Sequence, residues 1–133
     1  AAGARMRLSV AGHPGRVYGL AVAPDGKRLA TASWDQTVIL WDLNSGTQFG
    51  NKLDAKDEGV WAVKYSPDGK LLAGAGQDGT TKVWDAETGA ELETFGRHKG
   101  TVHTVRFDAT GSILVTGGRD GTVRLWDVGK LRR

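Results

Sequence analysis

Short stretches in which apolar residues alternate with small or polar ones recur along the chain. The segment 17–22, VYGLAV, alternates in this way and is followed by the turn sequence APDGK. Similar segments at 60–65 and 102–107 end in SPDGK and DATGS. Alternation with a period of two, bounded by turns that contain Asp and Gly, predicts short β-strands, and no segment shows helical periodicity.

Each recurring unit contains further strand-like stretches after the first. The second stretch is small and apolar throughout, as expected for a strand that is buried on both faces. The third follows an Asp-Gly or Asp-Gln turn and ends in Trp-Asp, and a fourth follows a Gly-containing loop in the first two units. The predicted second strands are 29–33, 71–76 and 113–118, the third strands are 37–41, 80–84 and 122–126, and the fourth strands are 47–53 and 91–95.

The Trp-Asp pairs show that the unit repeats at a constant length. Trp41, Trp84 and Trp126 are spaced by 43 and 42 residues. A period in this range, combined with strand-type patterning, is typical of propeller arrays. We therefore expect three repeats, at about 6–46, 47–89 and 90–130.

Three in-phase copies of Asp-x₅-Trp-Asp resemble the WD-repeat β-propeller family, and the resemblance covers nearly the whole chain. It implies an all-β fold of four-stranded antiparallel blades arranged around a channel. About three blades are expected here. They form an incomplete ring unless the chain oligomerises or belongs to a longer one, because closed propellers contain about four to eight blades.

The resemblance also implies a buried, hydrogen-bonded tetrad of Trp, Ser or Thr, His and Asp in each blade. By position, the first repeat carries the full set, whereas Gly118 takes the hydroxyl position in the third, and Lys56 and Gly76 replace His and Ser in the second. Because a buried carboxylate must be hydrogen-bonded, we expect blades two and three to be looser than blade one. The expected members are His13, Ser33, Asp35, Trp41, Asp78, Trp84, His98, Asp120 and Trp126.

These polar residues do not indicate an active site. His13, Ser33 and Asp35 have the composition of a catalytic triad, but the resemblance implies a buried network between strands rather than a cleft. The histidines do not converge as zinc ligands must, and the glycine turns lack the Lys and Ser of a phosphate loop. We therefore expect no enzyme activity, no catalytic residue, no metal and no cofactor.

The resemblance places a partner-binding surface on the top face of the blades, beside the start of each first strand and just before each turn Asp. Tryptophan, tyrosine and arginine, the residue types enriched at interface hot spots, are prominent there. The alternative is that the tryptophans of this set pack against adjacent loops. The expected contact residues are Arg16, Tyr18, Trp34, Trp61, Gln77, His103 and Arg119, with Gly59 and Thr101 at equivalent positions.

Composition narrows the choice of partner only slightly. The net charge is +3 with mixed signs, so a polyanion is permitted but nucleic acid is not the expected partner. The chain has no cysteine, which excludes disulfides but does not by itself indicate a compartment. No apolar run is long enough for a membrane span or a secretory signal, and we expect an intracellular, cytoplasmic protein. The basic residues near the two ends are interpreted as solvated: Arg5, Arg7, Lys130, Arg132 and Arg133.

Three repeats leave the predicted fold incomplete. An open set of three blades exposes two flat apolar faces, which isolated soluble proteins avoid. A spare outer strand is expected at 7–10, whereas no convincing fourth strand follows Asp127. Further blades would come from a longer chain, another subunit or a second copy. The predicted function is a non-catalytic scaffold that binds a protein or peptide; the alternative is a regulatory or substrate-positioning propeller domain of a larger enzyme.

Overall fold

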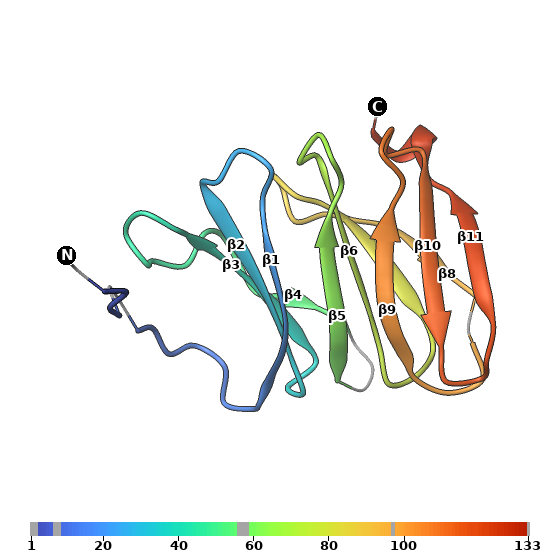
Figure 1. Ribbon diagram of the computed structural model, residues 1–133, viewed down its shortest axis with the longest axis horizontal. Helices are drawn as coiled ribbons and strands as arrows, with labels where there is room; N and C mark the ends of the chain where they lie inside the picture. The colour runs from blue at the N-terminus through green and yellow to red at the C-terminus, as the bar shows by residue number, and fades with distance from the viewer. Residues whose placement is uncertain (1–2, 7–8, 56–58, 97, 133) are drawn as a thin grey trace.

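The computed structural model of the chain describes residues 3–6, 9–55, 59–96 and 98–132. Within these residues, eleven β-strands form three antiparallel sheets, which we call blade one, blade two and blade three (Figure 1). Blade one contains β1 (Val17–Val22), β2 (Arg28–Ser33), β3 (Thr37–Asp42) and β4 (Leu53–Asp54). Blade two contains β5 (Val60–Tyr65), β6 (Leu71–Gly76), β7 (Thr81–Asp85) and β8 (Glu91–Phe95). Blade three contains β9 (Val102–Phe107), β10 (Ile113–Gly118) and β11 (Val123–Asp127), and the 3₁₀ turn η1 (Gly129–Arg132) follows it.

The strands of each blade are hydrogen-bonded to one another in chain order. The first strands of the three blades, β1, β5 and β9, contact one another in turn, and Figure 1 shows them side by side. The blades succeed one another without closing into a ring. The predicted all-β fold of propeller blades in an incomplete ring is therefore confirmed, with three strands rather than four in the described part of blade three.

The tight turns between the second and third strands of each blade require a left-handed backbone conformation. Gly79 and Gly121 supply it in blades two and three with φ of 86° and 80°. Gln36 occupies the same position in blade one with φ of 74°, where a residue with a Cβ is sterically disfavoured. This turn therefore carries local strain that its two counterparts do not.

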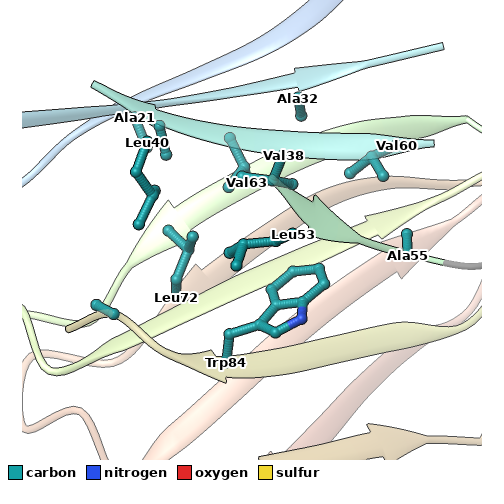
Figure 2. Packing of buried hydrophobic residues seen from close by; sticks show 12 residues of the cluster. Ala21, Ala32, Val38, Leu40, Leu53, Ala55, Val60, Val63, Leu72 and Trp84 are labelled. Atoms are coloured by element: carbon teal, nitrogen blue, oxygen red, sulfur yellow. The ribbon is translucent and has the colours of Figure 1, made fainter. Parts of the chain in front are cut away.

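Two apolar layers hold the blades together. We call the side of a blade that looks towards the earlier blade its leading face, and the opposite side its trailing face. The first layer joins the trailing face of blade one to the leading face of blade two, where Trp84 lies below Leu53 and Ala55 (Figure 2). The second layer joins blades two and three through residues such as Val83 and Leu114. Because residues alternate between the two faces along each strand, the inner strands β6 and β7 of blade two contribute to both layers.

The fourth strand of blade one differs from the prediction. A strand was expected over 47–53, but β4 contains only Leu53–Asp54, preceded by an isolated bridge between Trp41 and Gln48. Gly50 has φ of 70°, and the polar residues Asn51 and Lys52 follow it. This local turn carries the backbone away from the edge of β3, so pairing resumes only at Leu53.

The two ends of the described chain also bear on the predictions. Of the spare strand expected at 7–10, residues 7 and 8 lie outside the described residues, and Ser9 and Val10 are not in a strand. The last residues form η1, and Val128 is fully buried in the second apolar layer. Leu131 packs against that layer as well.

Candidate functional site

A hydrogen-bonded network ties the strands of blade one together around His13. One ring nitrogen, Nδ1, lies 2.9 Å from Oδ2 of Asp35, and the other, Nε2, lies 2.7 Å from the hydroxyl of Thr31. The indole Nε1 of Trp41 donates to the same hydroxyl at 2.9 Å. The Thr31 hydroxyl therefore joins the imidazole to the indole.

The hydroxyl member of this network is Thr31 and not Ser33, so the prediction for Ser33 was wrong. In the strand register Leu29 faces Trp41, and an indole reaches the diagonal neighbour of its partner, which is Thr31. Ser33 lies beyond that reach, and its Oγ instead accepts from the backbone N–H of Asp35 at 3.1 Å.

Blade three contains the same network in full, which corrects the expectation that Gly118 leaves it without a hydroxyl. Thr116 lies 2.8 Å from His98 Nε2, and Trp126 Nε1 donates to it at 3.2 Å. Asp120 lies 3.1 Å from His98 Nδ1. Gly118 instead makes room for the imidazole, since a Cβ there would stand 2.5 Å from Nδ1.

Blade two keeps only part of the network. The position equivalent to Thr31 and Thr116 is Gly74 rather than Gly76, and the Trp84 ring lies so close that a Cβ on Gly74 would be 2.8 Å from it. Asp78 accepts from the backbone N–H and hydroxyl of Thr80 at 3.0 and 2.8 Å. Lys56, expected in place of the histidine, lies outside the described residues.

A threonine two residues after each turn Asp completes these networks. The hydroxyls of Thr37 and Thr122 donate to Asp35 and Asp120 at 2.5 and 2.7 Å. The sequence contains the signal for them, because Thr37, Thr80 and Thr122 recur in phase with the repeat. The tetrad that the resemblance implies has four members and does not include this threonine.

The hydrogen bonds keep the network carboxylates ionised. Burial by itself raises the pKa of Asp35, but the bonds from Thr37 and His13 outweigh it and hold the pKa below its ordinary value of 3.8. The Thr122 hydroxyl is the largest cause of a stronger depression of the Asp120 pKa, and His98 and the backbone N–H of Lys99 add to it. Each carboxylate is thus stabilised in its charged form.

This geometry gives the networks a structural role. The side chains of His13 and His98 are 3% and 1% exposed, and both ring nitrogens of each are occupied by neighbouring residues. A general base must reach a substrate proton, and neither imidazole has a free nitrogen to do so. Within the described residues, no cluster of three His, Cys, Asp or Glu side chains is placed to hold a metal ion.

The structure brings the expected top-face aromatic residues into contact across all three blades. Tyr18 stacks on Trp61 with ring centroids 4.3 Å apart, and Trp34 meets Tyr18 edge-on at 6.3 Å. On the other side, His103 meets Trp61 edge-on at 6.1 Å. We call Trp34, Tyr18, Trp61 and His103 the aromatic ladder. Tyr18, Trp61 and His103 are the second residues of β1, β5 and β9. In Figure 1, β5 and β9 begin at the lower edge of the molecule.

Arg16 and Arg119 lie at the outer blades of this row and are exposed. Trp34 is 48% exposed, although its ring also lies against Gly59, so it both packs locally and faces solvent. Trp61 and Gln77 are both partly buried, and the indole Nε1 of Trp61 and the Oε1 of Gln77 are buried without a hydrogen-bond partner among the described residues. The expected residues therefore differ in exposure: four are exposed, namely Arg16, Trp34, His103 and Arg119, and three are partly buried, namely Tyr18, Trp61 and Gln77.

The blades, their Trp-Asp strand ends and their histidine networks together define a WD-type propeller segment. The family described as WD domain, G-beta repeat matches the chain three times, at 5–42, 47–85 and 89–127. These matches cover most of the chain, so the protein belongs to this family. No helix within the described residues is long and apolar enough to span a membrane.

Several curated proteins are similar to part of the chain. Small ribosomal subunit protein RACK1y of Oryza sativa subsp. japonica is 43% identical over 51 residues, covering 38% of this chain and 15% of that protein. Tricorn protease homolog 1 of Streptomyces coelicolor is 46% identical over 59 residues, covering 44% and 5%. Ribosome biogenesis protein erb1 of Botryotinia fuckeliana is 43% identical over 54 residues, covering 41% and 7%. The chain thus spans only a small part of each of these relatives.

Proposed function

We propose that the chain is a scaffold segment that binds a protein or peptide partner on its top face. The observation that carries this proposal is the aromatic ladder, which joins side chains from all three blades into one continuous surface. Aromatic and arginine side chains dominate binding energy at protein interfaces because they bury a large area at a low cost in conformational entropy.

Rigid display is the proposed mechanism. Tyr18, Trp61 and His103 stand near the starts of β1, β5 and β9, so the neighbouring strands fix their spacing. Arg16 and Arg119 are exposed beside them. The carboxylates of Asp35 and Asp120 are held in the turn networks. A partner segment with apolar or aromatic side chains would pack on the ladder, and its acidic groups would meet the arginines.

Panning a displayed peptide library against the chain tests this proposal. The peptides it selects are then titrated against the parent chain, the double variant Trp61→Ala/Arg119→Ala and the control Phe49→Ala. Phe49 packs on Arg28, outside the ladder, so its removal should leave the affinity unchanged. The double variant should bind at least about tenfold more weakly, because two hot-spot residues are lost. Unchanged affinity of a folded double variant would exclude the top face.

Salt titration separates a protein partner from nucleic acid. Binding that rests mainly on aromatic contacts, with two arginines beside them, should weaken only modestly with ionic strength, whereas binding to nucleic acid weakens steeply as salt is added. Two relatives are named for the ribosome or its biogenesis. Those names accord with the intracellular location that we expected, and we extend that expectation to this chain as part of the proposal.

A second candidate function is a propeller module of a larger enzyme. The similarity to a protein named as a protease homolog favours this possibility. In that case the blades would position a substrate for a catalytic domain elsewhere in the protein. A longer protein that contains this chain together with a catalytic domain should then show an activity that Trp61→Ala lowers. Absence of activity in such a protein would argue against an enzyme module.

A further inference from the structure

A pocket of about 220 Å³ lies where the inner strands of the three blades end. Blade one lines it with Ala21 and Pro24, blade two with Lys64, and blade three with Arg106 and Phe107. In Figure 1, β5 and β9 run upwards from the lower edge, so the pocket lies at the other end of these strands from the aromatic ladder. The pocket is therefore built around blade two, by consecutive blades of one chain.

Two cationic side chains line this pocket without a counterion. Lys64 on β5 and Arg106 on β9 are equivalent residues of neighbouring blades, and both are exposed. Neither side chain forms an ion pair or a hydrogen bond with any other described residue. The equivalent residue of blade one is Ala21, so that side of the pocket is apolar. A cleft lined by charge of one sign attracts ions of the opposite sign.

The carboxylates closest to these cations in the sequence do not line the pocket. Asp25, Asp68 and Asp108, in the turns after β1, β5 and β9, accept from backbone N–H groups of their own turns at 2.9, 3.0 and 2.9 Å. Tyr65 does line the pocket, but burial raises its pKa to about 12, so the phenol stays neutral at physiological pH. Among the described residues, the lining thus contains two cations and no carboxylate, a formal charge of +2.

We propose that this pocket binds the phosphate group of a small organic phosphate. A phosphate monoester carries a charge of about −1.5 to −2 at pH 7. That charge compensates both cations, whereas a single carboxylate would leave one of them uncompensated. The guanidinium of Arg106 offers a planar fork of donors that matches phosphate oxygens, and Lys64 adds a point charge.

The size of the pocket indicates the kind of molecule that carries the phosphate. At about 220 Å³ it is smaller than the roughly 300–1,000 Å³ of sites for drug-sized ligands. The organic part is therefore small, and it packs against apolar side chains such as Phe107 and Pro24. This site uses two side chains rather than a glycine-rich phosphate loop, whose Lys and Ser are missing from the turns. It does not rest on the proposed function of the top face.

Titration of phenyl phosphate into the chain, followed by nuclear magnetic resonance, tests the proposal. Saturable shifts are expected at Lys64, Arg106 and Phe107. Lys64→Gln and Arg106→Gln should each weaken binding about tenfold or more, because a charge-assisted hydrogen bond is lost. Lys70→Gln removes the same charge from an exposed position outside the pocket and should change the affinity less than about twofold. All three lysine and arginine positions are exposed, so the variants should fold, which near-ultraviolet circular dichroism checks.

Two further probes define the class of ligand. Benzoate offers the same ring with one charge and should bind more weakly than phenyl phosphate, so equal binding would overturn the assignment to a phosphate. A phosphoserine peptide has the same chemical group on a protein chain, and tighter binding of this peptide than of phenyl phosphate would overturn the small-molecule ligand. Absence of saturable binding, or an equal loss in Lys70→Gln, would overturn the site itself. None of these results bears on the top face, whose test depends on Trp61 and Arg119.

Discussion

Blades two and three hold their strands together by different means. Blade two lacks a hydroxyl at Gly74, yet every residue of β6 is buried because a neighbouring blade covers each of its faces. Blade three has the complete network around His98, while Val123 and Leu125 of β11 remain exposed. Burial of two apolar faces and a satisfied polar network are thus alternative ways to stabilise the same sheet.

The magnitudes of the two contributions indicate which is larger. Complete burial of one Val or Leu side chain contributes about 1.5–3 kcal/mol, and β6 and β7 bury several apolar residues. A single net hydrogen bond contributes about 1 kcal/mol. Burial should therefore outweigh the missing members of the network in blade two. For this reason we now expect blade two to be the most stable of the three, although the incomplete tetrad alone predicted the opposite.

The largest effect is expected from removing the tryptophan of the doubly covered blade. Trp84 is 2% exposed and packs in the layer between blades one and two. Trp84→Ala should lower the free energy of unfolding by about 3–5 kcal/mol, because it leaves a large cavity. Trp126, which stacks on Phe95 at 4.9 Å and is only partly buried, should cost less when replaced by alanine. Denaturant titration measures both, and equal losses would contradict the comparison.

An intermediate effect is expected from the polar network of blade three. Thr116→Val keeps the side-chain shape but removes the hydroxyl that His98 and Trp126 share. The stranded polar groups should lower the free energy of unfolding by about 1–3 kcal/mol. Thr104→Val makes the same chemical change at an exposed position of β9 and serves as the control. If Thr116→Val and Thr104→Val lowered the free energy of unfolding equally, the network would not contribute to stability.

Lowering the pH should destabilise the polar networks, with a smaller effect than that of Thr116→Val. The pKa values of Asp35 and Asp120 are lowered in the folded protein from an ordinary value of 3.8. A depressed pKa contributes stability above the unfolded value, and this contribution is lost as the pH falls towards the folded value. The melting temperature should therefore hold from neutral pH down to about 4 and fall below it. Asp120→Asn should flatten that fall; an unchanged slope in this variant would exclude Asp120 as its source.

The smallest effect is expected in the β2–β3 turn of blade one. Gln36→Gly relieves a left-handed residue that costs about 1–2 kcal/mol, offset by about 0.4–1 kcal/mol from the greater freedom of glycine in the unfolded chain. The net gain should be about half a kcal/mol. Gly121→Gln, at φ of 80° and with open space around its Cβ position, should give a loss of similar size in blade three. Midpoints of denaturant unfolding measure both changes in stability. A less stable Gln36→Gly variant or a more stable Gly121→Gln variant would contradict the assignment of strain to the left-handed glutamine.

Much of the fold could be predicted because its signals are local. β1, β5 and β9 begin and end at the predicted residues, since alternation and Asp-Gly turns specify them. The bounds of the fourth strand of blade one could not be predicted, because the left-handed turn at Gly50 interrupts the pairing with β3 between Gln48 and Leu53. The length of this interruption depends on the backbone conformation around Asn51 and Lys52. The residue types there do not predict at which residue pairing with β3 resumes.

The sequence predicted which positions contribute to the candidate site, but not which side chains contact one another there. The resemblance named the aromatic residues of the top face, while the stacking of Tyr18 on Trp61 depends on the spacing between blades. The hydroxyl members were missed because the reach of an indole across the register, and not the order of residues, selects Thr31 over Ser33. Thr31 and Ser33 are two residues apart on β2, so both lie on the same face of the sheet and their spacing cannot distinguish them.

Amide hydrogen exchange on the chain compares the blades most directly, because it reports the protection of each strand separately. If burial outweighs the polar network, the amides of β6 exchange more slowly than those of β2 and β10, which lie in blades with complete networks. Faster exchange in β6 than in both other strands would show that the tetrad, and not the covering of two faces, sets the stability of a blade.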